Sequence, residues 1–324
     1  MPVGLARRAA VLMLMLGSGA PAVAADPYPN RPVKVIVNTA AGGFTDAMAR
    51  VAAQEMAVYL RQPVVIENKG GADGLIGIRA AKAAPADGYT LLAATGTITQ
   101  QMALRIDAGY DLGKDFIGVG PVSRSPFLMV VSISQPDKKL GDFISRAKAN
   151  PGKLTFASAG VGTAPHLATE RFLQQAGLRV NHIPYKGNAP AVPDVIGGRV
   201  DMMYDTVASA APNVRGGRLR ALAVTAQHRV AALPDVPTFA EMGIANYSAY
   251  TWVAFFAPAG TPPHIVKKLH DALRQAVMSK QLQQKMKDEG AEVMDMKFDQ
   301  FNQFLARETV QAAKLISDLG IPKQ

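Results

Sequence analysis

Two stretches of this sequence place closely spaced glycines directly before a helix. The first, NTAAGGFTD at 38–46, follows the apolar run VKVIV, and the second, ASAGVGTAPH at 157–166, follows a short apolar strand pattern. A turn of this kind brings free backbone N–H groups to the positive end of a helix dipole, so both stretches favour an anion. The chemistry they predict is therefore the binding of a negatively charged group.

Neither stretch fits a nucleotide-binding or catalytic motif. No lysine follows the first glycine pair as a P-loop requires, and GVGTAP departs from G-x-G-x-x-G at its last position. Ser158 lies in FASAG rather than in G-x-S-x-G, and the five histidines show no H-E-x-x-H spacing. The chain has no cysteine, which excludes thiol catalysis and cysteine-based zinc sites. We therefore expect no catalytic residue, no metal and no cofactor.

The residues of these turns also have structural interpretations. The two glycines could form an ordinary tight turn. Asp46 stands in a first helical turn, where the dipole favours any carboxylate, and it would repel a bound anion, so it is better explained as fixing the loop or as accepting from donor groups. His166 could be an ordinary residue at a helix start. Asp205, at the end of the apolar run VDMMY, could equally be a cap.

The first residues have the features of a secretory signal peptide. A basic start is followed by the short apolar run AAVLMLMLG and an A-x-A cleavage site, so we expect a signal peptide over 1–25 and an exported, periplasmic protein. No later segment offers the ~20 uninterrupted apolar residues of a membrane helix. The formal net charge is +10, but no basic run carries interleaved aromatic residues, and nucleic-acid binding is not expected.

The rest of the chain alternates apolar strands with helical patterns, which predicts an α/β architecture. Strands are expected at 33–37, 63–68, 127–132 and 250–258, and an amphipathic helix begins at Leu140. The two strand–glycine–helix turns predict two α/β lobes: domain 1 over 26–126 plus 252–324, and domain 2 over 127–251. Two crossings between lobes would form a hinge.

Several stretches taken together resemble the Bug family, the substrate-binding proteins of tripartite tricarboxylate transporters. The matching residues are YPNRPVKVIV with AAGGFTD, QPVVIENKGGADGLIG, DGYTLL, AKANPGKLTFASAGVGTAPHLA, HIPYKGNAPAV, GGRVDMMYD, GGRLRALAVT, LPDVPTFAEMG and APAGTP. They occur in order over nearly the whole mature chain, which makes the resemblance highly specific.

The resemblance implies a two-lobed periplasmic-binding-protein fold, type II-like, that closes like a Venus flytrap on a small organic carboxylate. It implies no enzyme activity and, as partners, the organic acid and the membrane permease subunits of a tripartite tricarboxylate transporter; we expect a monomer. The family holds a carboxylate with backbone groups and waters at the first turn. By position, the implied ligand-binding residues are Gly42, Gly43, Thr45, Asp46, Gly96, Thr97, Ser158, Gly162, Thr163, His166 and Asp205.

The chain departs from the family pattern at two places. Asn38 and Thr39 stand where the family often has Pro-Phe, so the usual aromatic wall is missing, and Phe44 could replace it. These polar residues could favour a smaller or more hydroxylated ligand. The segment GTITQQMAL at 96–104 also lacks the Asn-Pro that is common in the family, which could change the rim of the site.

Three functions stay open at this point. The first is a solute-binding protein that delivers a carboxylate to a transporter. The second is an exported subunit that presents the same kind of ligand to a sensor kinase. The third is an α/β enzyme whose catalytic residues meet only in space. The sequence does not identify the acid.

Overall fold

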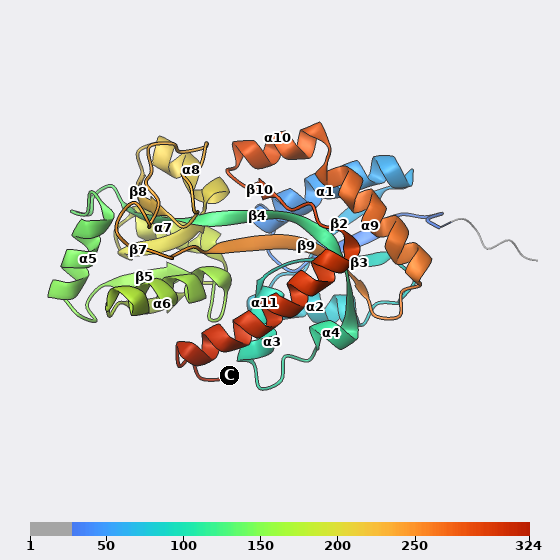
Figure 1. The fold of residues 1–324 in the computed structure, drawn as a ribbon, viewed down its shortest axis with the longest axis horizontal. Helices are drawn as coiled ribbons and strands as arrows, with labels where there is room; N and C mark the ends of the chain where they lie inside the picture. The colour runs from blue at the N-terminus through green and yellow to red at the C-terminus, as the bar shows by residue number, and fades with distance from the viewer. Residues whose placement is uncertain (1–27) are drawn as a thin grey trace, which may run out of the picture.

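The computed structural model describes residues 28–324, and the expected signal peptide over 1–25 lies outside them. The described chain is a mixed α/β fold with two lobes joined by long, continuous strands (Figure 1). Within these residues, no helix combines the length and the apolar character that a membrane span needs.

The first lobe is built on a mostly parallel sheet that continues into antiparallel strands. Its strand order is β2–β1–β3–β9–β4, with the short β10 on β4. The apolar runs of β1, β3 and β9 are mostly buried, as strands covered by helices on both faces must be, whereas the edge strand β2 is partly exposed. The bounds are β1 Val33–Val37, β2 Val64–Asn68, β3 Thr90–Thr95, β4 Phe116–Ser132, β9 Tyr250–Pro258 and β10 Glu292–Val293.

The second lobe repeats the same order of strands. β5 lies between β6 and β7, and β4 lies between β7 and β8. In the first lobe β2, β1 and β3 run parallel, and β9 joins them from the second lobe. In the second lobe β6, β5 and β7 run parallel, and β4 joins them from the first lobe. The bounds are β5 Thr155–Ser158, β6 Asn181–Pro184, β7 Met202–Thr206 and β8 Leu219–Val224.

The strand expected at 127–132 is only the second half of β4, which has 17 residues. Its first part pairs with β9 as far as Pro126, and from Phe127 onward it pairs with β7 and β8. Glycines and prolines in 116–126 hide this part from a pattern search, and the structure accommodates them with register shifts near Gly118 and Pro121. The exact domain limits stay predictions.

Helices cover both faces of the first sheet. Ile265, Leu269 and Leu273 form one apolar face of α9 and pack into the same core as α1 and α10. The opposite face buries Phe301, Phe304 and Leu305 of the last helix. The bounds are α1 Phe44–Leu60, α2 Leu75–Lys82, α3 Thr97–Leu104, α4 Leu112–Asp115, α9 Pro263–Val277, α10 Lys280–Asp288 and α11 Phe298–Asp318, with the 3₁₀ turn η1 at Ala72–Gly74.

The second sheet is covered in the same way. Phe143 and Phe172, from α5 and α6, pack into one core, and α7 and α8 supply the other. α5 begins at the predicted Leu140 and ends at Ala149, two residues before Pro151, because proline cannot continue a helix. The bounds are α5 Leu140–Ala149, α6 Ala164–Ala176, α7 Asn188–Ile196 and α8 Val207–Arg215.

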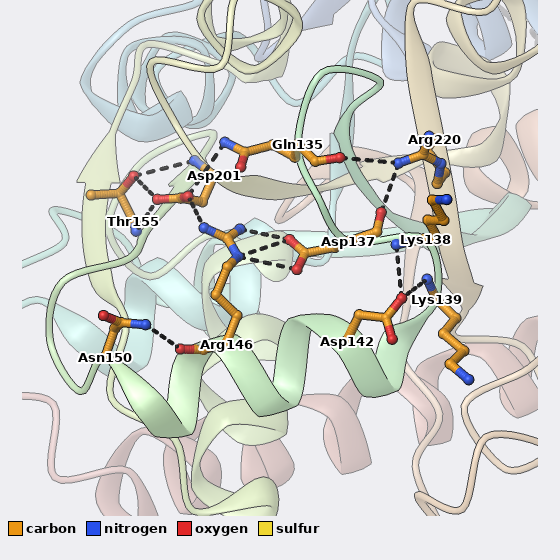
Figure 2. A network of polar contacts seen from close by, with 10 residues as sticks. All are labelled: Gln135, Asp137, Lys138, Lys139, Asp142, Arg146, Asn150, Thr155, Asp201 and Arg220. Carbon is orange, nitrogen blue, oxygen red and sulfur yellow. Dashed lines mark hydrogen bonds and ion pairs between the residues drawn. The ribbon is translucent and has the colours of Figure 1, made fainter.

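A polar network ties α5 to the sheet at the starts of β5 and β7 (Figure 2). The guanidinium of Arg146 binds the carboxylate of Asp137, with the shortest contact at 2.6 Å, and that of Asp201 at 2.7 Å. Asp201 in turn accepts from the backbone N–H of Thr155 at 2.9 Å. This network lies at the amino ends of the parallel strands, the edge opposite the glycine turns.

Candidate ligand-binding site

The first glycine turn is shaped by Asp46. This carboxylate is 4% exposed and accepts from the Gly42 N–H at 2.9 Å, from Arg50 Nε at 3.0 Å and from Asn68 Nδ2 at 2.8 Å. Burial alone would raise the pKa of Asp46, but the hydrogen bonds from Arg50, Gly42 and Asn68 outweigh it and lower the pKa. Asp46 therefore stays ionised and holds the loop, as its structural interpretation predicts.

The glycines of this turn have different conformations. Gly42 has φ +84°, the left-handed region that favours glycine, whereas Gly43 is extended at φ −85°. A Cβ atom at Gly43 would meet only the Ala40 carbonyl oxygen, at 4.0 Å. Gly43 is the N-cap of α1, and no side chain caps the helix there. The N–H groups of this helix start, where Thr45 is buried in the first turn, are available to an anion.

The predicted pair Gly96 and Thr97 begins α3. Gly96 is its N-cap, and a Cβ atom there would lie 3.1 Å from Trp252 Nε1, so the indole ring packs tightly against this position. The same Nε1 donates to Glu308 Oε2 at 2.8 Å. Trp252 is thus a packing residue behind the turn, and the Thr97 N–H is engaged by Thr95 Oγ1 at 3.3 Å.

In the second lobe, the predicted side chains brace the glycine turn from inside. Thr163 Oγ1 donates to the Gly160 carbonyl oxygen at 2.7 Å, and the Gly162 N–H donates to His166 Nδ1 at 3.1 Å. Ser158 Oγ accepts from the Gly160 N–H at 3.1 Å. Thr163 is the N-cap of α6 but forms no side-chain cap, so this helix start resembles that of α1.

A histidine that the sequence analysis did not single out supports this turn. His182 Nε2 lies 2.6 Å from Ser158 Oγ, and its ring stacks on His166 with centroids 4.1 Å apart. Burial lowers the pKa of His166 to about 3, helped by the charge of His182, and burial lowers the pKa of His182 to about 4. Both rings are therefore neutral near pH 7, which lets His166 Nδ1 accept from the loop. No local sequence pattern indicates this role, because it depends on the pairing of β6 with β5, which sets His182 opposite Phe156.

Asp205, the next-to-last residue of β7, has a buried and hydrogen-bonded carboxylate. Oδ1 accepts from the Thr206 N–H at 2.9 Å and from Asn188 Nδ2 at 2.7 Å, and a hydrogen bond from Ser209 also favours the ionised carboxylate. The side chain is 1% exposed, and burial raises the pKa of Asp205. Asn188, the first residue of α7, is a further site candidate that the sequence analysis missed.

The turns of the two lobes meet at an interlobe contact formed by η1, α3 and residues 160–162. Gln101 Nε2 donates to the Val161 carbonyl oxygen at 2.9 Å. Arg105 donates from Nε to Gln101 Oε1 at 3.0 Å and from its terminal nitrogen Nη2 to Asp73 Oδ2 at 2.7 Å. A Cβ atom at Gly160 would lie 2.5 Å from Asp73 Oδ1, and Gly160 has φ +132°, so a glycine at this position lets the Asp73 side chain lie against the loop.

A separate cavity of about 880 Å³ lies between α10, β10 and residues 225–231. Lys280, Lys287, Arg124 and His228 are among its lining residues, and none of the predicted ligand-binding residues is. Across residues 28–324, no group of three or more His, Cys, Asp or Glu side chains is placed to hold a metal ion.

A family profile decides the relationship of this chain to known proteins. The profile described as "Tripartite tricarboxylate transporter family receptor", TctC, matches residues 48–321. The chain belongs to the TctC family. Among curated TctC relatives, BugT from Bordetella pertussis is 36% identical over 312 residues, covering 96% of this chain and 95% of BugT. The resemblance to the Bug family is thereby confirmed.

Solved structures similar to this TctC chain show the same fold. The periplasmic binding protein BugD has a TM-score of 0.86 at 34% identity and covers 92% of this chain and 100% of that one. A Rhodopseudomonas palustris protein with adipate has a TM-score of 0.87 at 32% identity, covering 91% and 99%. MatC from the same organism, with bound malate, has a TM-score of 0.83 at 31% identity, covering 89% and 100%. The two-lobed periplasmic-binding-protein fold is confirmed.

Proposed function

We propose that this protein is an extracytoplasmic solute-binding protein that captures a small organic carboxylate between its lobes and delivers it to the membrane subunits of a tripartite tricarboxylate-type transporter. One observation carries the proposal. The starts of α1 and α6 both lie at glycine turns, and neither has a capping side chain. Uncapped N–H groups at a helix start are suited to a carboxylate. Similar TctC-type structures contain adipate and malate.

The proposed site lies between the two turns and is lined mainly by backbone. Gly42 and Gly43 border it in the first lobe, with Thr45, Gly96 and Thr97 beside them. Gly162 and Thr163 border it in the second lobe, with Asp205 at the adjacent strand end. Ser158 and His166 support the second turn from behind, and Asp46 supports the first. The ligand would be bound and released unchanged, with export to the periplasm directed by residues 1–25.

A binding screen tests the capture of a carboxylate. The mature protein would be screened by thermal unfolding against mono-, di- and tricarboxylates, because a ligand of the folded state raises the melting temperature by mass action. We expect at least one small carboxylate to raise it and to bind with one-site stoichiometry by calorimetric titration. A panel in which no carboxylate shifts the melting temperature would contradict the proposal.

Delivery needs a separate measurement. Uptake of the labelled acid would be followed in cells that carry the permease subunits, with and without the gene for this protein. We expect uptake to depend on this protein. N-terminal sequencing of the exported protein checks the expected processing near Ala25, and an intact Met1 would contradict it.

A further inference from the structure

The cavity between α10 and residues 225–231 has walls from both lobes. In the first lobe it is lined by α10 and residues 290–293, and in the second lobe by residues 225–231 and 248–249. Arg124 and Tyr250, on the two strands that connect the lobes, also line it. In Figure 1, α10 and β8 lie on the same side of β4, one over each lobe. A molecule bound in this cavity would therefore contact both lobes.

One polar face of α10 borders this cavity. Its lining residues follow the spacing i, i+3, i+4 and i+7, which places them on one side of a helix, and they are Lys280, Gln283, Gln284 and Lys287. All four are exposed, whereas the other side of α10 is buried in the first core. The face presents two ammonium groups and two amides, and ammonium groups only donate hydrogen bonds.

The charge of the lining residues is positive. Among the described residues that line the cavity, the only carboxylate is Glu292, and it accepts from Arg124 Nε at 2.6 Å. Lys280 and Lys287 pair with no carboxylate of residues 28–324. Their charges are therefore not neutralised by a neighbouring side chain, and we call this space the basic cavity. Seven residues separate the two lysines, which is about 10 Å along the helix.

The width of the basic cavity depends on how the lobes are arranged. Gly290 lines its edge with φ +62°. A Cβ atom at Gly290 would strike Val207 Cγ1 and would lie 3.3 Å from Ala232 Cβ, so the turn after α10 lies against the second lobe. Because the two walls belong to different lobes, a partner that contacts both walls recognises one arrangement of the lobes.

We propose that the basic cavity is a docking surface for an extended acidic segment of a protein partner, bound across both lobes. Charge complementarity selects the partner, because the two ammonium groups attract carboxylates and repel cations. An extended chain rises about 3.3 Å per residue, so carboxylates about three residues apart match the spacing of the two lysines. The exposed, polar walls suit a chain that lies along them, whereas small-molecule sites are mostly apolar and enclosed. The inference goes beyond the proposed function, since the basic cavity contains none of the predicted ligand-binding residues.

A model peptide tests this docking. A peptide of about ten glutamates with a neutral dye would be titrated with the mature protein by fluorescence anisotropy at about 0.02 M salt, where exposed charges are weakly screened. We expect one-site binding of this peptide and none of a glycine–serine peptide of the same length. A parent protein that does not bind the glutamate peptide overturns the proposal. Stronger displacement of the peptide by sodium sulfate than by sodium chloride of equal ionic strength would indicate a small-anion site and would also overturn it.

Charge reversals then locate the bound peptide. Lys280→Glu combined with Lys287→Glu replaces two attractions by two repulsions, and we expect peptide affinity to fall about tenfold or more. Lys148→Glu combined with Lys153→Glu changes the net charge equally at exposed positions outside the cavity, and should lower affinity by no more than about twofold. All of these side chains are exposed, and a melting temperature near that of the parent shows that each variant is folded. Equal losses in the two double variants would mean that the peptide responds to net charge alone, which overturns the assignment.

The wall of the second lobe is tested separately. His228→Glu places a negative charge in that wall, and we expect peptide affinity to fall about threefold or more. An unchanged affinity would show that the segment contacts only α10, which overturns docking across both lobes. None of these results bears on the capture of a carboxylate, so the proposed function can stand or fall independently.

Discussion

Gln101 on α3 of the first lobe donates from Nε2 to the carbonyl oxygen of Val161 in the second lobe, at 2.9 Å. The same side chain receives Arg105 Nε at its Oε1, at 3.0 Å. Gln101 is fully buried, so the contact is shielded from water and its orientation is fixed by Arg105. This hydrogen bond connects the lobes beside the candidate site and stabilises the arrangement in which the two glycine turns face each other.

Gln101→Ala should therefore weaken ligand binding without unfolding either lobe. A net hydrogen bond contributes about 0.5–1.5 kcal/mol, so affinity should fall roughly two- to tenfold. Calorimetric titration with the acid found in the screen measures it. Gln303→Ala, at an exposed position on α11, is the control. Equal affinities for the Gln101 variant and the parent would mean that this hydrogen bond does not support the ligand-bound arrangement.

Substitutions at the two glycines of the first turn should have different effects, one on the stability of the fold and the other on ligand affinity. Gly42→Ala forces a side chain into φ +84° and should lower the free energy of unfolding by roughly 1–2 kcal/mol. Gly43→Val has an allowed φ and open space around its Cβ, so the fold should persist while the side chain obstructs the start of α1. We expect its affinity to fall about tenfold or more, equivalent to about 1.4 kcal/mol. Urea unfolding and titration on both variants measure the two effects, and tight binding by Gly43→Val would place the carboxylate elsewhere.

The buried histidines predict acid sensitivity. The pKa of His166 is about 3 in the folded protein, whereas a histidine in an unfolded chain has a pKa of about 6.5. Between these values the unfolded state binds more protons, so stability is fully present above pH 6.5 and falls as the pH drops toward 3. From pH 7 to pH 5, His166 alone should account for a loss of about 2 kcal/mol.

Unfolding titrations at several pH values check this expectation. His166→Gln should flatten the pH dependence, because glutamine does not titrate and can still accept from the Gly162 N–H. His228→Gln, at an exposed position, should leave the dependence as in the parent. A parent protein whose free energy of unfolding is the same at pH 7 and pH 5 would show that His166 is protonated as easily in the folded state as in the unfolded one.

Breaking the ion-pair network of Figure 2 should lower the free energy of unfolding without changing ligand affinity. Asp137 is 1% exposed, and Arg146→Met would leave its buried carboxylate without the cation that contacts it. Breaking a buried pair in this way costs about 3–5 kcal/mol. Because the network lies at the strand edge opposite the glycine turns, the folded fraction should bind ligand as tightly as the parent. Lys148→Met, at an exposed position of the same helix, should change the free energy of unfolding by less than about 0.5 kcal/mol.

The local signals that predicted the fold were strong because they did not depend on distant residues. The runs at Val33–Val37 and Tyr250–Pro258 are buried strands, and α5 begins and ends where its amphipathic pattern and Pro151 indicate. The first half of β4 was missed, since its glycines and prolines are tolerated only through pairing with β9. That pairing joins residues more than a hundred positions apart, and no local pattern contains it.

In the candidate site, too, features set by local sequence could be predicted, whereas features set by long-range contacts could not. The glycine turns could be recognised from sequence, and the role of Asp46 in the loop followed from the helix dipole and charge repulsion. The contribution of His182 could not be recognised, because it depends on strand pairing that brings its ring against His166. Asn188 matters only through its contact with Asp205, 17 positions away. The predicted ligand-binding role of the glycine turns and of Asp205 stays a prediction until a ligand is bound.

The last residue of the chain has a fixed position that affects how the protein can be handled. Gln324 pairs with the end of α3 in both directions: its N–H donates to Leu104 O at 3.0 Å, and its carbonyl oxygen accepts from the Ile106 N–H at 2.7 Å. Leu104 is also the side chain that a Cβ atom at Gly162 would strike. A label attached at Gln324 would therefore start beside the seam between the lobes, whereas Tyr28 is anchored on the first lobe, where its hydroxyl donates to the Gly88 carbonyl oxygen. Attachment of the protein to a biosensor surface is better made near Tyr28 than at Gln324.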